Sequence, residues 1–124
     1  MTTRAITAAT VRETVADNDI VLLDFWAAWC GPCRSFAPVF EQASKDHADI
    51  VFGKVETEAE RELAASFGIT SIPTLIAFRE GVVMFSQPGA LAAPQLDQLV
   101  TKLRDLDMAD VHAQVAAQQA GVAR

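Results

Sequence analysis

Two cysteines are the residues of this chain whose type and spacing most directly predict chemistry. Cys30 and Cys33 are the only cysteines among its 124 residues, and Gly31 and Pro32 separate them. A disulfide between them would close a very small loop, and a crosslink stabilises a fold less as that loop becomes shorter. In a reducing cytosol, a close cysteine pair is more often catalytic or metal-binding than structural. We therefore interpret the pair as a chemical site.

The expected position of Cys30 favours its thiolate form. An apolar run from Ile20 to Trp26 predicts a central strand, and apolar residues at helical spacing predict a helix from Pro32 to about Ala48. Cys30 then lies just before a helix, where unpaired N–H groups and the helix dipole favour a negative charge. Lowering a thiol pKa from about 8.5 to near neutrality requires about 2 kcal/mol, which a helix terminus and a few hydrogen bonds nearly supply.

The order of the two cysteines predicts thiol–disulfide exchange. The Cys30 thiolate is the species that attacks a disulfide. Cys33, one turn inside the helix, can then attack the mixed disulfide and release the reduced substrate. Pro32, at an early helical position, costs no hydrogen bond and presets the backbone.

A zinc site, two inert core cysteines and a purely structural disulfide are the alternatives. The chain has no second cysteine pair, and only His47 and His112 could complete a zinc site. The two histidines lie at unrelated positions, so we expect no metal.

The remaining sequence predicts alternating strands and helices. Apolar periodicity and turn residues place strands at 4–6, 20–26, 51–55, 74–78 and 82–85, and helices at 8–17, 32–48, 58–67 and 92–106. This order predicts an α/β fold with a mixed central sheet, which has a parallel core, an antiparallel carboxyl-terminal hairpin and helices on both faces. Cys30 falls on a strand-to-helix junction, where α/β proteins place their sites.

Composition excludes several classes of function. The chain is 51% hydrophobic, and its 16 acidic residues outnumber 10 basic ones for a net charge of −6. An acidic chain without a basic run lacks the footprint of a nucleic-acid or anionic-membrane binder. The longest apolar run, Ile20–Cys30, is too short to span a membrane and contains Asp24. The amino terminus has no signal-peptide pattern, so we expect a cytoplasmic protein.

The segment around the two cysteines resembles that of a known protein family. Leu23–Cys33 closely resembles the active-site segment of the thioredoxin family, and Ser71–Thr74 and Gly89–Ala90 resemble that family's two substrate-facing loops. The resemblance runs from near residue 4 to about Leu106, in the right order and at the right spacings. It implies a thioredoxin-like fold, with Cys30 as nucleophile, Cys33 as resolving cysteine and Gly31 and Pro32 tuning the redox behaviour.

The resemblance also assigns Asp24 as a buried acid near Cys33, with Lys54 beside it. Burial of Asp24 follows independently, because Leu22 and Trp26 share its strand face while apolar residues occupy the other. Desolvation should raise the pKa of this carboxyl, so that it can exchange protons near neutrality, and the Lys54 ammonium opposes that rise. The alternatives are an aspartate that reaches water and a simple surface lysine.

Pro73 is cis in the family and lies against the cysteines. The Ile72 backbone would then pair with an extended substrate segment. We expect a flat, apolar docking rim around an exposed Cys30 sulfur, formed by Trp29, Gly31, Pro32, Ile72, Gly89 and Ala90. A core position for Trp29 is the alternative.

The resemblance divides the chain into a domain at 1–106 and an extension at 107–124. The extension should be helical or partly disordered, with Asp107 as its cap and Met108, Val111, Val115 and Val122 on one face. It either packs on its own body or docks a partner. His112 has no evident partner and should be solvated.

These observations predict a cytoplasmic thiol–disulfide oxidoreductase that reduces protein disulfides. The uncharged Gly31-Pro32 pair favours the reducing direction. The family implies recycling by a flavin-dependent thioredoxin reductase that uses NADPH, whereas this chain needs no cofactor and should be a monomer. An oxidase or isomerase of the same fold, or a binding module with incidental redox activity, is the alternative.

Overall fold

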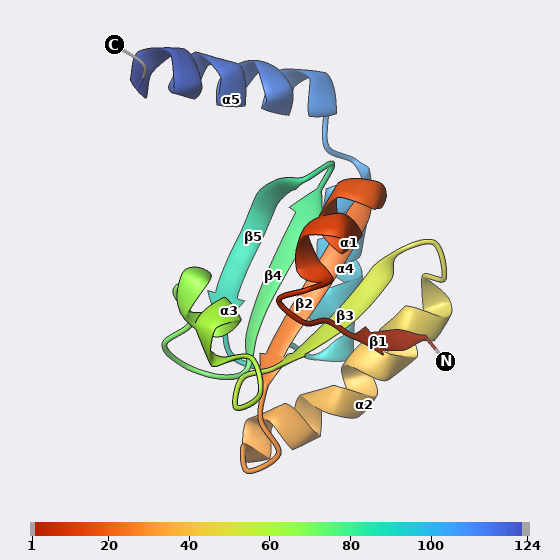
Figure 1. Ribbon diagram of the computed structural model, residues 1–124. Helices are drawn as coiled ribbons and strands as arrows, with labels where there is room; N and C mark the ends of the chain where they lie inside the picture. Colours follow the sequence, from red (N-terminus) through yellow and green to blue (C-terminus); the bar gives the residue numbers. More distant parts are fainter. Residues whose placement is uncertain (1, 123–124) are drawn as a thin grey trace.

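The computed structural model describes residues 2–122 (Figure 1). Within that range the strands are β1 (Thr3–Ala5), β2 (Ile20–Trp26), β3 (Val51–Glu56), β4 (Thr74–Arg79) and β5 (Val82–Pro88). The helices are α1 (Val11–Asp17), α2 (Gly31–Asp46), α3 (Arg61–Ser66), α4 (Ala93–Arg104) and α5 (Met108–Val122).

The strands form one mixed sheet in the order β1-β3-β2-β4-β5. β3 runs parallel to both of its neighbours, β1 and β2. β4 is antiparallel to β2 and to β5, with which it forms a hairpin. The central strand β2 is buried on both faces because its apolar residues are continuous rather than alternating. The predicted fold class is confirmed.

Alternate side chains of β2 belong to two separate cores. Ile20 and Leu22 pack against α2 and α4, and Phe36 and Phe40 of α2 supply the aromatic part of that core. Val21, Leu23 and Phe25 pack on the opposite face, against α1 and α3. The face of a β2 residue therefore decides which helices it meets, and Asp24 shares its face with Leu22, beneath α2 and α4.

Gly53 in β3 lets the edge strand approach closely. A Cβ at this position would lie 2.6 Å from Cγ1 of Ile6 and 2.9 Å from Cδ2 of Leu23, closer than side-chain atoms pack. The missing side chain thus makes room for two apolar residues beneath the sheet.

Two helices begin later than the periodicity predicts. α1 begins at Val11 rather than residue 8, and α3 begins at Arg61 rather than residue 58. Before α3 the Glu56 carboxylate accepts the Ala59 N–H at 2.6 Å, and the Thr57 N–H donates to the Trp26 carbonyl at 2.9 Å. These bonds hold the segment in turns.

α5 leaves the body of the molecule beyond the β4–β5 hairpin (Figure 1). Asp107 caps it, accepting the Asp110 N–H at 3.2 Å. Met108 is buried, and Val111 and Val115 are half-buried, whereas the other side chains between 109 and 120 are exposed. His112 is not without a partner, since its Nε2 lies 2.8 Å from Oε1 of Glu80 in the hairpin turn. The side chain of Val122 and residues 123 and 124 lie outside the described residues.

No helix within residues 2–122 combines the length and apolar character that crossing a membrane requires.

Candidate active site

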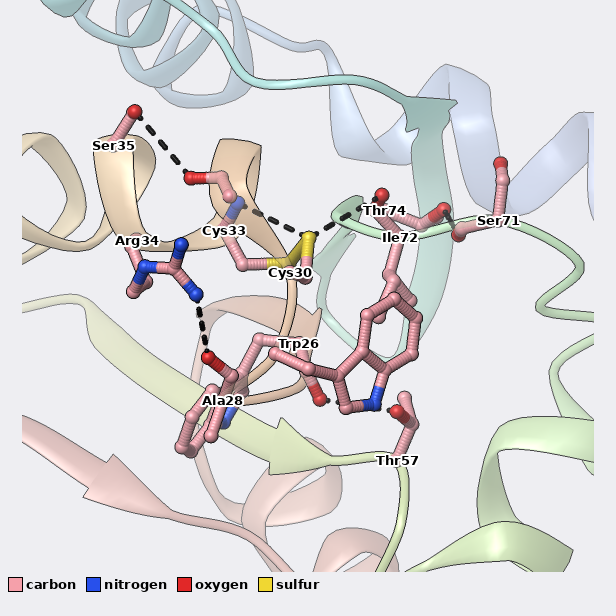
Figure 2. The surroundings of a disulfide bond; sticks show 12 residues. Trp26, Ala28, Cys30, Cys33, Arg34, Ser35, Thr57, Ser71, Ile72 and Thr74 are labelled. Carbon is pink, nitrogen blue, oxygen red and sulfur yellow. Dashed lines mark hydrogen bonds between the residues drawn. A yellow bond between two sulfur atoms is a disulfide. The ribbon is translucent and has the colours of Figure 1, made fainter.

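Cys30 is the N-cap residue of α2 (Figure 2). Its backbone is extended, its N–H donates to the Ala27 carbonyl at 3.2 Å, and its Sγ accepts the Cys33 N–H at 3.2 Å. The sulfur therefore takes the place that an oxygen usually occupies at a helix N-cap. Pro32 fits within the first turn because the N–H it lacks would have no helical partner there.

The two cysteines form a disulfide, and both are buried. Cys33 is 2% exposed and Cys30 is 4% exposed, so the expectation of an exposed Cys30 sulfur is wrong for this oxidised form. The sulfur is bonded to a residue inside the first helical turn, and it lies 3.7 Å from the Ile72 carbonyl oxygen across the site. The N-cap position of Cys30 alone did not indicate that the loop containing Ile72 would lie over this sulfur.

Asp24 is buried within the sheet at 1% exposure. Its neighbours in register are Lys54 on β3 and Leu75 on β4, and both carboxyl oxygens lack a hydrogen-bond partner among the described residues. Burial raises the pKa of Asp24 from 3.8 to about 6, and the nearby Lys54 ammonium limits that rise. The side chain faces the side of the sheet that α2 covers.

Lys54 is the register partner of Asp24 on β3, and its ammonium lies over the ring of Trp26. It is half-buried, and its Nζ lies 4.7 Å from the centroid of the Trp26 indole. A cation over an aromatic face is favourable, so the ring holds the ammonium near the sheet. This placement keeps a positive charge near the Asp24 carboxyl, where it favours the ionised form.

The substrate-facing loops meet beside the disulfide. The Ile72–Pro73 peptide bond is cis, as the resemblance implied, and Pro73 is buried. The Pro73 carbonyl accepts the Gly89 N–H at 2.8 Å, which ties the loop before β4 to the loop after β5. Gly89 has a φ of 104°, a conformation that favours glycine, and both Gly89 and Ala90 are exposed.

Trp29 is exposed, at 67%, rather than part of the core. Its Nε1 donates to Oε1 of Glu58 at 2.8 Å, and Oε2 of Glu58 pairs with Arg61 at 2.9 Å. The indole thus has a fixed direction although it lies in solvent. Sequence reasoning missed Glu58, whose one available signal was its place in the loop after β3, at the end of the sheet that holds the cysteines.

The rim beside Trp29 is hollow rather than flat. A pocket of about 330 Å³ opens there, lined by Trp29, Thr57, Ala64, Ile69, Thr70, Ser71 and Ile72. Gly31 is half-buried and Pro32 is exposed. Of the predicted rim residues, Trp29 and Ile72 line this pocket, and Ala64 of α3 adds a wall that spacing along the chain did not indicate.

His47 and His112 do not approach the cysteines to form a metal site. Within residues 2–122 no group of three His, Cys, Asp or Glu side chains is arranged to hold a metal ion.

Comparisons with known proteins agree with this geometry. The thioredoxin family model matches residues 2–104. A relative from Streptomyces coelicolor is 56% identical over 108 residues, covering 87% of this chain and 81% of its own length. Thioredoxin 1 of Synechococcus elongatus is 40% identical, covering 79% of this chain and 94% of its own.

Solved structures show the same similarity. A mutant thioredoxin from Halobacterium salinarum superposes with a TM-score of 0.77 at 29% identity, over 84% of this chain and 91% of its own. A Plasmodium falciparum thioredoxin gives 0.74 at 34% identity, over 80% and 97%. The chain belongs to the thioredoxin family of thiol–disulfide oxidoreductases, and its Cys30–Cys33 pair fits the active site of that family.

Proposed function

We propose that this oxidoreductase reduces disulfides in protein substrates, with Cys30 as the attacking and Cys33 as the resolving cysteine. The observation that carries the proposal is the cap position of Cys30, where the Cys33 N–H already donates to the sulfur. A donor and a helix N-terminus directed at the same sulfur stabilise the thiolate.

The first step joins enzyme and substrate. In the reduced protein the Cys30 thiolate attacks one sulfur of the substrate disulfide and forms a mixed disulfide. The second substrate sulfur leaves as a thiolate and takes a proton from solvent. One S–S bond forms and one breaks in this step, so no external electron donor or acceptor is required.

The second step releases the product. Cys33 gives its proton to the Asp24 carboxylate, and its thiolate attacks Sγ of Cys30. The Cys30–Cys33 disulfide forms, the mixed disulfide bond breaks, and the remaining substrate sulfur leaves as a thiolate that takes a proton from solvent, so two electrons in total have passed to the substrate. A carboxyl with a pKa of about 6 is basic enough to accept this proton near neutral pH, and it returns the proton when the disulfide is reduced again.

Substrate docking uses the surface around the disulfide. The Ile72 backbone would pair with an extended substrate segment, which brings a substrate sulfur toward Cys30. Trp29, Gly89 and Ala90 are exposed and would contact residues that flank the substrate cysteine. The bond from the Gly89 N–H to the Pro73 carbonyl would hold the two loops together beside this segment.

The cycle requires a source of electrons and a reducing compartment. We propose a flavin-dependent thioredoxin reductase that uses NADPH as the recycling partner, and the cytoplasm as the location of a monomeric protein. The family membership and the absence of further cysteines in the sequence support this assignment. The uncharged Gly31-Pro32 pair supports the reducing direction, because a positively charged side chain between the two cysteines would stabilise the thiolate further and make the couple more oxidising.

Insulin reduction with NADPH and the reductase of the same cell tests the proposal. The protein should accelerate the reaction, and replacement of either cysteine should abolish that acceleration. A measured reduction potential separates a reductase from an oxidase or isomerase, since 30 mV corresponds to about 1.4 kcal/mol for this two-electron couple. Full binding of a partner by a protein lacking both cysteines would favour a binding module instead.

A further inference from the structure

Arg34 is a charged residue at the active site to which the exchange steps assign no role. It follows Cys33 in the first turn of α2 and is exposed. Its Nη1 donates to the Ala28 carbonyl at 2.8 Å, as Figure 2 shows. Helical side chains lean toward the N-terminus of their helix, so an arginine in the first turn can reach the loop that precedes it.

The loop that Arg34 reaches is the one that places Cys30. β2 ends at Trp26 and α2 begins at Gly31, so the chain turns between them. The Cys30 N–H closes this turn on the Ala27 carbonyl, and the Arg34 backbone N–H donates to the Cys30 carbonyl at 3.1 Å. The guanidinium donates to the Ala28 carbonyl, which lies within the same turn. Arg34 therefore holds the turn through both its backbone N–H and its side chain.

The same bond places the positive charge of Arg34 beside Gly31, which lies between the two cysteines in the chain. A Cβ on Gly31 would lie 3.9 Å from Nη2 of Arg34, which places the guanidinium in contact distance of the segment between the cysteines. The first turn of α2 contains no acidic residue that would neutralise this charge.

Other charged groups near the site are already engaged elsewhere. Asp24 and Lys54 face each other on β2 and β3, and Glu58 pairs with Arg61 beyond Trp29. The Ser71–Thr74 loop and the Gly89–Ala90 loop carry no charged side chain. Arg34 is thus the cation that the helix itself supplies to the turn.

We propose that Arg34 is a positioning residue for thiol–disulfide exchange: its guanidinium holds the Ala27–Cys30 turn and favours the thiolate of Cys30. The family activity requires that thiolate whatever its substrate, so the proposal applies equally to a reductase, an oxidase or an isomerase.

Variants of Arg34 separate its charge from a general effect on folding. Arg34→Ala should raise the pKa of Cys30 by about 0.5 unit, as expected for one exposed charge, and lower its alkylation rate about threefold at pH values below that pKa. Arg34→Lys should restore most of the shift because it keeps the charge. Arg34→Gln should behave like the alanine variant.

Iodoacetamide alkylation of the reduced proteins across pH, with Cys30 followed by peptide mass spectrometry, measures this pKa. Arg12→Ala is the matched control, because Arg12 is an exposed arginine on α1, on the opposite face of the sheet. Amide exchange of the Cys30 N–H should also accelerate in Arg34→Ala and not in the control. The measurement needs neither a protein substrate nor a reductase, so it is independent of the proposed direction of the reaction.

Two results would overturn the inference. One is a Cys30 pKa in Arg34→Ala that equals the value in Arg12→Ala. The other is a raised pKa that Arg34→Lys fails to restore, which would assign the effect to something other than the charge.

Discussion

Replacing Asp24 with asparagine should stabilise the folded protein at neutral and alkaline pH. Asparagine matches the shape and polarity of a protonated aspartic acid, so the comparison isolates the cost of ionising a buried carboxyl. Burial raises the pKa of Asp24 from 3.8 to about 6. At 1.36 kcal/mol per unit, ionisation costs the folded state about 3 kcal/mol once the pH exceeds the higher value.

The sign and the pH window follow from the two pKa values. Below pH 3.8 the carboxyl is protonated in both the folded and the unfolded protein, and the variant should match the wild type. As the pH rises from 3.8 to about 6, the wild type loses stability because the unfolded chain releases the proton in this window while the folded protein still holds it. The advantage of Asp24→Asn should therefore grow across this window and stay constant above it, reaching about 10 °C in melting temperature.

Urea denaturation of the oxidised proteins at pH 3.5, 5, 7 and 8 provides the measurement, because the disulfide form excludes titration of the thiols. Asp17→Asn, which removes an exposed aspartate on α1, is the control and should show little pH-dependent change. An advantage of equal size at every pH would refute the reasoning, since it would arise from packing. No advantage at pH 8 would show that Asp24 is not desolvated.

Three further outcomes are expected. Asp24→Asn should slow insulin reduction more at pH 7 than at pH 9 in a rate profile, because alkaline pH itself deprotonates the resolving thiol. Gly53→Ala should lower the free energy of unfolding by about 1–3 kcal/mol in urea titrations, since its Cβ would meet Ile6 at 2.6 Å. Truncation after Asp107 should keep insulin reduction within about threefold and lower the melting temperature by a few degrees, because Met108 is the one buried side chain among residues 108–120. An equal loss of rate at both pH values would contradict the first prediction, and an unchanged unfolding midpoint would contradict the second. A truncated chain that fails to fold, or that changes oligomeric state by light scattering, would contradict the third.

The elements that hold the cysteines were predictable because local physics determines them. The apolar run of β2 is long enough to require cover on both faces, and burial of Asp24 within it followed from its neighbours alone. The position of Cys30 just before α2 followed from the apolar periodicity of α2 and from Pro32, although the helix begins one residue earlier than predicted, at Gly31. These features depend on residues close together in the chain.

Contacts between distant segments were not predictable in this way. The bond from Trp29 to Glu58 and the approach of the Ile72 carbonyl to Cys30 join residues that only the folded sheet brings together. The first of these gives the exposed indole its direction, and the second explains why the oxidised sulfur is buried. The contact between His112 and Glu80 is of the same kind, since it depends on where the hairpin turn lies.

Capture of a substrate on one cysteine and not the other tests the account most directly. A Cys33→Ser protein keeps the attacking sulfur and lacks the one that releases the substrate, so it should accumulate stable mixed disulfides through Cys30. Mass spectrometry of the complexes after incubation with a disulfide-bonded protein identifies the linked cysteine. The account predicts abundant complexes for Cys33→Ser and few for Cys30→Ser; equal capture by the two variants would contradict the assigned roles.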